Sequence, residues 1–490
     1  MRRILKNKKS LVGVIILTFF AIVAIIGPLF TTYDPIISGS VPPGKMPIAT
    51  SHCYPEWYRD FTGNEEYTKN LYVNPDPKFS DLSKLSLWKN VTTEGVQVNY
   101  NSNYGSSEKG CLEVAFTKEG NVTISMEFEY PYTIPPKMFA IDWRYLIQSQ
   151  GSMPRGQSIL LILINFTFDT PRGPKTYSAS MPYWIDDFTS ITSWISSPWH
   201  EASSTNPNLF IQYGKDPARV IFSKPRKYSF DFFVQLAGNT TGLENLKLLI
   251  DDVNIVIFGN SFGILGTDQL ARDIFTQLIA GTQISFFIGI ISALLGVGIG
   301  LLVGLIAGYI GGTTDEVLMR FTDMLLVLPT LPLLLVLVFV LGQTMFNIIL
   351  VVGVLGWMGF ARTVRSAVLS LKERAFIEAV KAAGGGRIYI IRRHIIPNVF
   401  PLIYVTLAMS VPGAIVSEAA LSWLGLGPAD VMSWGRILYE FQRSGNVALG
   451  ALQFWYWVIP PGLCIALLSL SFVLLGYALD EILNPRLRER

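Results

Sequence analysis

The sequence predicts an all-α bundle of six transmembrane helices with an inserted all-β domain, a jelly-roll-like β-sandwich. Of the 490 residues, 50% are hydrophobic and only 15% are charged, which is too apolar for an ordinary soluble protein. Six segments have the roughly 20 mainly apolar residues that a helix needs to cross a bilayer. After the first of these segments the composition changes to Ser, Thr, Asn, Pro and aromatic residues, and short alternating runs replace the long apolar ones.

The predicted spans cover residues 10–32, 282–310, 318–342, 345–368, 397–420 and 452–479. Basic residues precede the first span, as they do in a signal peptide: Arg2, Arg3, Lys6, Lys8 and Lys9. Its apolar run is too long for a signal peptide and no small-residue cleavage site closes it, so we expect a retained span. The predicted domains are a first span at 1–35, an insert at 36–258 and a membrane core at 259–490.

The distribution of basic residues predicts the orientation of the bundle. Positive charges gather between the fourth and fifth spans and in the tail: Arg365, Lys372, Arg374, Lys381, Arg387, Arg392, Arg393, Arg486, Arg488 and Arg490. The segment between the third and fourth spans has none, and residues 421–451 contain only Arg436 and Arg443. Basic loops stay in the cytoplasm. We therefore expect a multi-pass protein of the cell membrane with both termini cytoplasmic and the insert extracellular.

The second predicted span carries a glycine at every fourth residue, on one helix face: Gly296, Gly300, Gly304 and Gly308. Small residues let another helix approach closely, so we expect this face to pack against a neighbouring span. Chance is the alternative, because membrane helices are rich in glycine. Pro329 and Pro332 in the third span and Pro412 in the fifth should bend their helices, since proline removes a backbone donor.

Candidates for chemistry are few. Asp323 and Glu418 lie near span ends, and a carboxylate in a span is a candidate functional group. The alternative is a hydrated carboxylate at the membrane interface. No spacing of Cys and His indicates a metal, no Gly-rich phosphate loop is present, and no histidine has a convincing catalytic partner. We expect no enzyme activity, no metal and no cofactor in this chain. A net charge of +3 gives no indication of nucleic acid.

The insert reads as a series of strands. Residues 121–130 alternate between apolar and polar side chains, which is typical of a strand buried on one face. Similar runs give the predicted strands 111–117, 157–168, 217–223, 229–236 and 246–258. Many short strands with turns between them predict a β-sandwich. Residues 248–255 resemble the last strand of jelly-roll carbohydrate-binding modules.

Three further features of the insert give predictions. Four Asn-x-Ser/Thr sequons, at Asn90, Asn121, Asn165 and Asn239, fit an extracellular glycoprotein, although a Ser/Thr/Asn-rich segment also produces them by chance. Cys53 and Cys111 could form a disulfide in an oxidising compartment, or could be two unpaired thiols. Five tryptophans could form a sugar-stacking platform, but tryptophans in a sandwich more often lie in its core: Trp88, Trp143, Trp184, Trp194 and Trp199.

The basic segment 373–396 resembles the EAA loop of ATP-binding-cassette importer permeases. The resemblance rests on Glu378, Ala379, Gly384 and Pro397. The residues that we expect to couple to the ATPase are Glu378, Ala379, Ala382, Gly384, Arg387 and Pro397. Val380 departs from the second Ala of that motif and Ile396 from its Leu, and both changes keep the position apolar. In that family the loop is the coupling helix, which docks into a cleft of the ATPase subunit. A helix at 373–383 would place Phe376, Val380 and Ala383 on the docking face.

Further segments outside the insert resemble the second permease subunit of di/oligopeptide importers. They are the first span, the element Gly266–Asp273, the segment Ser417–Gly427 and the pair Trp434-Gly435. The resemblance implies a transport subunit without its own ATPase site. It would work with a homologous second permease, two cytoplasmic ATP-binding subunits and an extracellular substrate-binding protein, in a lipid bilayer.

Several functions stay open at this level. The resemblance implies import of di- or oligopeptides, and import of oligosaccharides such as cello-oligosaccharides is the alternative within the same family. Nickel import is disfavoured because no ligand cluster is visible. Outside the transporters, a membrane-anchored glycan-binding receptor or a channel would explain the spans and the insert. Neither needs a loop that docks on an ATPase, so segment 373–396 favours the importer.

Overall fold

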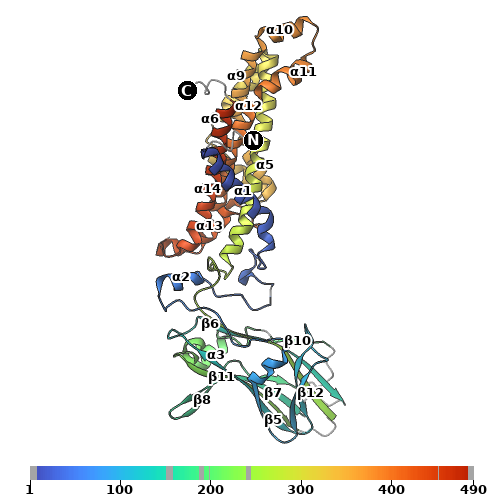
Figure 1. The fold of residues 1–490 in the computed structure, drawn as a ribbon, viewed down its shortest axis with the longest axis vertical. Coiled ribbons are helices and arrows are strands. Elements are labelled where there is room, and N and C mark those ends of the chain that lie inside the picture. The colour runs from blue at the N-terminus through green and yellow to red at the C-terminus, as the bar shows by residue number, and fades with distance from the viewer. Residues whose placement is uncertain are drawn as a thin grey trace. The chain divides into compact units, whose positions relative to one another are not determined.

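The fold is described from a computed structural model, which covers residues 8–42, 44–150, 158–186, 193–197, 199–238, 244–450 and 452–483 (Figure 1). Asn239 and the basic residues of both chain ends, apart from the backbone of Lys8 and Lys9, lie outside these ranges. The chain divides into two compact units, one formed by Met1–Ile36 with Asp273–Arg490 and the other by Ile37–Arg272. The first unit is helical and the second is built on β-sheets.

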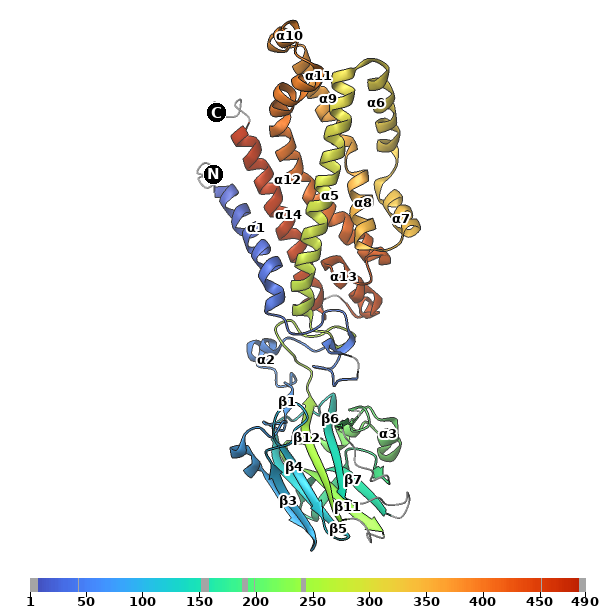
Figure 2. The same cartoon turned by 90° about the vertical axis from the view of Figure 1, so that its right-hand side faces the viewer.

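The helical unit contains α1 Lys8–Ile26, α5 Ile274–Ile310, α6 Gly312–Val327, α7 Thr330–Leu341, α8 Met345–Leu355, α9 Met358–Lys372, α10 Ala375–Ala382, α11 Arg387–Ile390, α12 Ile396–Leu421, α13 Trp434–Arg443 and α14 Trp455–Leu483. In the described part of the chain, five helical segments are long and apolar enough to cross a membrane, or six if the bent pair α6–α7 forms one span. The predicted multi-span helical membrane fold is therefore confirmed. α5 contacts α1, α8, α9 and α12 (Figure 2).

The third predicted span, 318–342, is sharply bent, and its bend at Pro329 was predicted from the sequence. α6 and α7 meet at an angle of 92°. The break lies at Leu328, which has extended backbone angles, φ −71° and ψ 134°. Pro329 follows it, and proline disfavours the helical conformation of the preceding residue. The chain therefore leaves α6 at Leu328 and begins α7 at Thr330.

The glycine face of α5 lies against α8 and α9. A Cβ atom built at Gly296, Gly300, Gly304 or Gly308 would lie 3.0, 2.8, 2.6 or 3.0 Å, respectively, from a backbone carbonyl oxygen of Gly353, Trp357, Ala361 or Arg365. These distances leave no room for a side chain, because real Cβ atoms almost never come closer than about 3 Å to another heavy atom. The four glycines thus set how closely α5 approaches this pair of helices.

The β unit contains two six-stranded sheets. The first has the order β10-β6-β12-β4-β3, with β1 also paired to β12, and the second has the order β2-β5-β11-β7-β8, with β9 also paired to β7. The strands are β1 Leu71–Tyr72, β2 Trp88–Thr92, β3 Val96–Asn101, β4 Cys111–Phe116, β5 Gly120–Tyr130, β6 Met138–Gln150, β7 Ser158–Thr170, β8 Gly173–Ser178, β9 Tyr183–Ile185, β10 Ile195–Ser196, β11 Arg226–Gly238 and β12 Glu244–Phe258. The unit also contains three short α-helices, of which α2 Glu56–Thr62 precedes β1, and α3 Pro207–Tyr213 and α4 Pro217–Ile221 lie between β10 and β11.

One apolar core lies between the two sheets, so the unit is a β-sandwich. Trp143 of β6 in the first sheet meets Phe232 of β11 in the second, with ring centroids 5.3 Å apart. The alternating run in β5 behaves as its pattern predicts, since Val122, Ile124 and Met126 are buried in this core. The strand order alone leaves the jelly-roll description as a prediction.

Two sequence assignments differ from the structure. Residues 217–221 form helix α4 and not a strand, because Asp216 caps its first turn by accepting a hydrogen bond from the Ala218 backbone N–H at 3.0 Å. Residues 259–272 belong to the β unit, beyond the boundary set at 258. Their backbone pairs with the segment after the first span, as in the hydrogen bonds Tyr54 N–H to Asn260 O at 2.8 Å and Thr267 N–H to Cys53 O at 3.0 Å.

Candidate functional site: an exposed loop and a cavity among the spans

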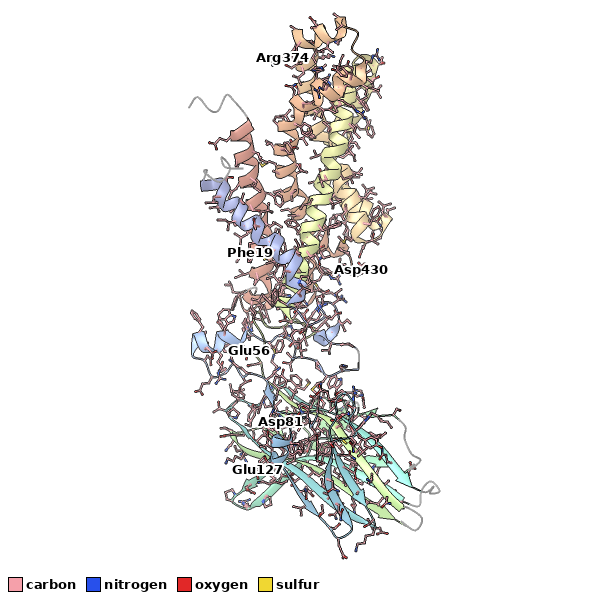
Figure 3. The ribbon with its side chains drawn as sticks, turned by 45° about the vertical axis from the view of Figure 1, so that its right-hand side comes forward. Phe19, Glu56, Asp81, Glu127, Arg374 and Asp430 are labelled. Carbon is pink, nitrogen blue, oxygen red and sulfur yellow. The ribbon has the colours of Figure 1, made fainter. Side chains whose placement is uncertain are left out.

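Helix α10 lies at one end of the helical unit, beyond the ends of the long helices (Figures 1 and 2). Arg374 directly precedes it, and Figure 3 shows Arg374 and Asp430 at opposite ends of this unit. Glu378, Ala379 and Ala382 are all exposed on α10. The residues that define the EAA-like motif are therefore available to a partner at this end.

Gly384 ends α10 with a specific backbone geometry. Its φ of +82° lies in the left-handed region, which only glycine enters without cost. The Gly384 N–H donates to the Lys381 carbonyl at 3.0 Å and the Gly385 N–H to the Val380 carbonyl at 2.9 Å. This pair of bonds is the Schellman motif, which closes a helix and reverses the chain. The glycine of the sequence motif thus fixes the end of the exposed helix.

The docking face predicted for α10 is only partly correct. Phe376 is 42% exposed, but Val380 packs against a cluster inside the helical unit. Ile377 is fully buried in the same cluster, together with residues of α9, α11 and α12. The apolar side of α10 therefore holds the helix onto its own chain. The exposed face consists of Phe376, Glu378, Ala379, Ala382 and Ala383, and Ile388 and Tyr389 of α11 are exposed beside it.

Pro397 lies where α11 continues into α12. A π-helical turn, Ile391–Ile395, joins the two, and the Ile396 N–H donates to the carbonyl of Ile391. Proline has no N–H and its ring clashes with the carbonyl four residues earlier, so a widened turn lets the helix continue past it. Pro397 thus shapes the entry to α12, while Arg387 at the start of α11 is exposed.

Two ion pairs connect α9 to α6. The Arg365 guanidinium donates from both Nε and Nη2 to Asp315, at 2.5 and 2.6 Å. Arg362 pairs with Asp323. Both members of this second pair are about half exposed, so Asp323 is a surface ion-pair partner in this structure. The Ala361-Arg362-x-x-Arg365 element therefore braces α6 beside the loop.

A cavity of about 240 Å³ lies among α5, α7, α8 and α12. No charged residue lines it within the described part of the chain. Its hydroxyl-bearing residues are Ser292, Thr330, Ser410 and Ser417, and the rest of the wall is apolar or glycine. Sequence reasoning missed this site, although hydroxyl residues on three apolar segments would have been the signal. The cavity can accept a polar, uncharged group, such as a peptide bond, through hydroxyl hydrogen bonds.

Glu418 is buried near the end of α12, with 1% of its surface exposed. Its Oε1 atom accepts hydrogen bonds from the Ser422 hydroxyl at 2.7 Å and the Ser433 hydroxyl at 2.6 Å. Ser433 also caps α13 by accepting from the Arg436 N–H at 3.1 Å. Glu418 thus joins the end of α12 to the start of α13.

The Trp434-Gly435 pair packs this corner. Trp434 is fully buried and its Nε1 donates to the Leu278 carbonyl of α5 at 3.1 Å. A Cβ atom at Gly435 would lie 2.6 Å from the Cα of Ala419, so α13 and α12 touch through backbone atoms. Both residues serve packing.

The sequence-predicted sites of the insert are scattered. Cys53 and Cys111 are free thiols in two separate buried clusters, so of the two alternatives the structure has the unpaired thiols. Asn90 is exposed, and Asn121 and Asn165 are half-buried. Trp143 lies in the core and Trp88 packs at its edge, while Trp194 and Trp199 pack on two other clusters and Trp184 is 63% exposed. The five tryptophans form no common platform.

Comparisons with known proteins match segments of this chain to permeases of binding-protein-dependent transport systems. The model of a family described as "Binding-protein-dependent transport system inner membrane component" matches residues 300–489, and that of the "N-terminal TM domain of oligopeptide transport permease C" matches residues 1–43. The oligopeptide transport system permease protein OppC of Bacillus subtilis is 39% identical over 228 residues, which cover 46% of this chain and 72% of that protein. The dipeptide transport system permease protein DppC of Lactococcus lactis is 31% identical over 349 residues, 70% of this chain and 97% of that protein. A solved chain of the MetNI methionine ABC transporter matches at 18% identity and a TM-score of 0.34, over 41% of this chain and 96% of that one.

The fold and the loop define a multi-pass membrane protein of the transporter class. The chain belongs to the family of binding-protein-dependent transport system inner membrane components, which confirms the resemblance seen in the sequence. Its relatives are permease subunits and not enzymes, so the prediction of a transport subunit is confirmed as well.

Proposed function

We propose that this chain is one of two permease subunits of an ATP-driven importer and carries di- or oligopeptides across the cell membrane. Its relatives named for oligopeptide and dipeptide transport support this substrate class. The partners would be a homologous second permease, two cytoplasmic ATP-binding subunits and an extracellular substrate-binding protein. Substrate released by the binding protein would cross between the two permeases as the bundle alternates between outward and inward openings.

The observation that carries the proposal is the build of α10. Its apolar side is fixed to the chain's own core through Ile377, while Glu378 and Ala379 face outward. Movement of an ATPase docked on this face would therefore pass to α9, α11 and α12, which share that core. α12 lines the cavity with Ser410 and Ser417, so motion of the loop reaches the wall of the proposed pathway.

The proposal also fixes an orientation. α10 and both chain ends would lie in the cytoplasm, and the β-sandwich would lie outside the cell. The basic residues of 363–396 support the cytoplasmic side for α10, because positively charged loops are retained there. An extracellular sandwich would also expose Asn90 to glycosylation where the host has that machinery.

The test is ATP-driven uptake of a labelled tripeptide by proteoliposomes that contain all partners. Glu378→Arg reverses the one negative charge on the proposed docking face, and we expect uptake to fall at least about tenfold while the purified chain keeps its thermal stability. Glu316→Arg on α6 is the matched charge reversal, because Glu316 is exposed and pairs only with Arg320 among the described residues. Unchanged uptake in Glu378→Arg would contradict the docking role, and uptake of cello-oligosaccharide without peptide would contradict the substrate.

A further inference from the structure

A cleft of about 680 Å³ lies on the outer face of the first sheet of the sandwich. Ile141 and Trp143 of β6 point into the core, so Asp142 and Arg144 between and beyond them point out into the cleft. The same alternation on β12 turns Asn254 outward. The volume lies within the range of pockets that enclose small ligands.

Most of the charged groups in this cleft already form hydrogen bonds or ion pairs with other side chains of the chain. Asp252 accepts hydrogen bonds from the hydroxyls of Ser106 and of Ser107, the latter at 3.0 Å, and its Oδ2 lies 3.4 Å from Arg144 Nη1. Lys78 lines the cleft and pairs at 2.5 Å with Glu108, which does not line it. These contacts hold the walls of the cleft in place.

Two charges of opposite sign remain. Among the described residues, the Asp142 carboxylate has no hydrogen bond to another side chain and no ion pair, and the Lys45 ammonium has none either. Asp142 stands on the floor, half-buried, and Lys45 stands on the segment 41–48 that forms one wall. The Asp142 carboxylate is half-buried and, within the described ranges, is held only by the Trp143 backbone N–H and by the more distant charges of Arg144 and Lys45. A ligand that brings an ammonium group within hydrogen-bond reach is therefore stabilised there.

The remaining wall is apolar. Met46 and Val256 line it, and Tyr72 lies at its edge with 62% of its surface exposed. Phe258 also lines the cleft but is 1% exposed, so Tyr72 alone offers an aromatic face. Sugar sites usually present aromatic faces for stacking, whereas this cleft presents one free anion, one free cation and an apolar wall between them.

We propose that this cleft binds a short peptide as a zwitterion, with its ammonium group at Asp142, its carboxylate at Lys45 and its side chains against the apolar wall. The β-sandwich would then hold the class of solute that the permease carries. That role rests on the proposed function, whereas the binding itself does not depend on it.

The pH dependence of binding follows from the site. Burial raises the pKa of Asp142 to about 6, Arg144 and Lys45 oppose the rise, and Asp252 adds to it. The free carboxylate becomes protonated as the pH falls through about 6, so the affinity for an ammonium group falls there as well. A peptide amine loses its proton above about 8. Affinity should therefore peak between these two limits.

The test is isothermal titration calorimetry of the purified full-length chain in detergent micelles, without ATP or partner subunits. The ligands are a tripeptide with free ends, its N-acetylated form, its C-amidated form and cello-oligosaccharide. We expect binding of the free tripeptide, and at least about tenfold weaker binding of each capped form, because each loses one charge-assisted contact.

Variants identify which residue meets which end. Asp142→Asn should weaken the free tripeptide about as much as acetylation does, and the two changes combined should cost no more than either alone. Lys45→Gln should show the same relation to amidation. Asp169→Asn and Lys215→Gln, both exposed and outside the lining of the cleft, are the matched controls and should change nothing.

Three results would overturn the inference: equal affinity for free and capped peptides, binding of cello-oligosaccharide without peptide, or no binding at all. Since the measurement needs no transport, its failure leaves peptide uptake by the assembled importer untouched. Peptide binding in the cleft without peptide uptake would instead reject the proposed substrate and keep the site.

Discussion

Glu418 shows how a single buried carboxylate can hold two helices together. It lies in the span α12 and accepts hydrogen bonds from the hydroxyls of Ser422, at the end of α12, and Ser433, just before α13. Sequence reasoning singled it out as an ionisable group in a span but could not tell that its role is to join helices. That distinction depends on Ser433, which is 15 residues away in sequence and contacts Glu418 only in the fold.

We predict that Glu418→Ala destabilises the protein and Glu418→Gln does not. The amide oxygen of glutamine can still accept from Ser422 and Ser433, whereas alanine leaves both hydroxyls without that acceptor, at a cost of about 1–3 kcal/mol. Thermal unfolding of the purified chain in detergent micelles measures the difference. If the two variants lose the same stability, the negative charge and not the hydrogen bonding is what matters at this position.

Gly384 permits a sharper test, because the chain supplies its own control. Gly384→Ala places a Cβ in the left-handed region at φ +82°, which costs about 1–2 kcal/mol and should loosen the end of α10. Gly386→Ala, at φ −67°, should be neutral. Neither position has a heavy atom within 4 Å of the new Cβ, so only backbone strain separates them. Peptide uptake should fall in the first variant and persist in the second, and equal uptake would mean that the helix end need not be fixed.

At the scale of elements, α5 offers another matched pair, which is one glycine of the period-four face and one glycine outside it. A Cβ at Gly304 would lie 2.6 Å from the Ala361 carbonyl oxygen, whereas one at Gly298 meets nothing within 4 Å. Gly304→Ala should therefore destabilise the bundle by about 1–3 kcal/mol through overpacking. Gly298→Ala should be neutral or stabilising, since alanine favours helix. Thermal unfolding of both variants checks this, and a stable Gly304→Ala would show that α5 and α9 can separate without loss.

Periodicity predicted the long elements and failed where local chemistry overrode it. The apolar run 318–342 has the length of a span, but Pro329 sets the conformation of Leu328 and breaks it into α6 and α7. Residues 217–223 look apolar enough for a strand, yet Asp216 and Pro217 are an N-cap followed by a favoured first helical residue. Pro329 had already predicted the bend in the third span, whereas Pro217 was not used and carried the missing information at 217–223.

At the scale of the whole molecule, composition alone separated the helical unit from the β-sandwich. The sequence could not place residues 259–272, because their pairing with the segment around Tyr54 joins chain positions some 200 residues apart. The coupling loop was predictable from its motif. The cavity among the spans and the cleft on the sandwich were not, because each is lined by residues from several distant elements.

The two units also allow a direct test of the proposed orientation, in which the β-sandwich is outside the cell and α10 is inside. Two positions suit cysteine labelling, since both side chains are exposed: Glu119 after β4 and Ala382 in α10. The native thiols give little background, because Cys53 and Cys111 are fully buried and Cys464 lies within the apolar helix α14. A membrane-impermeant maleimide applied to intact cells should label Glu119→Cys and spare Ala382→Cys.

Permeabilised cells that express the chain without the ATP-binding subunits are the control for that experiment, because both variants should then react and so prove that both thiols are accessible. Labelling of Ala382→Cys in intact cells would place α10 outside. An ATPase in the cytoplasm could not then dock on it, and the importer mechanism would fail for this chain. Labelling of neither variant in intact cells would place both the β-sandwich and α10 on the inner side. The chain would then cross the membrane an even number of times between the sandwich and α10, and not three times as proposed.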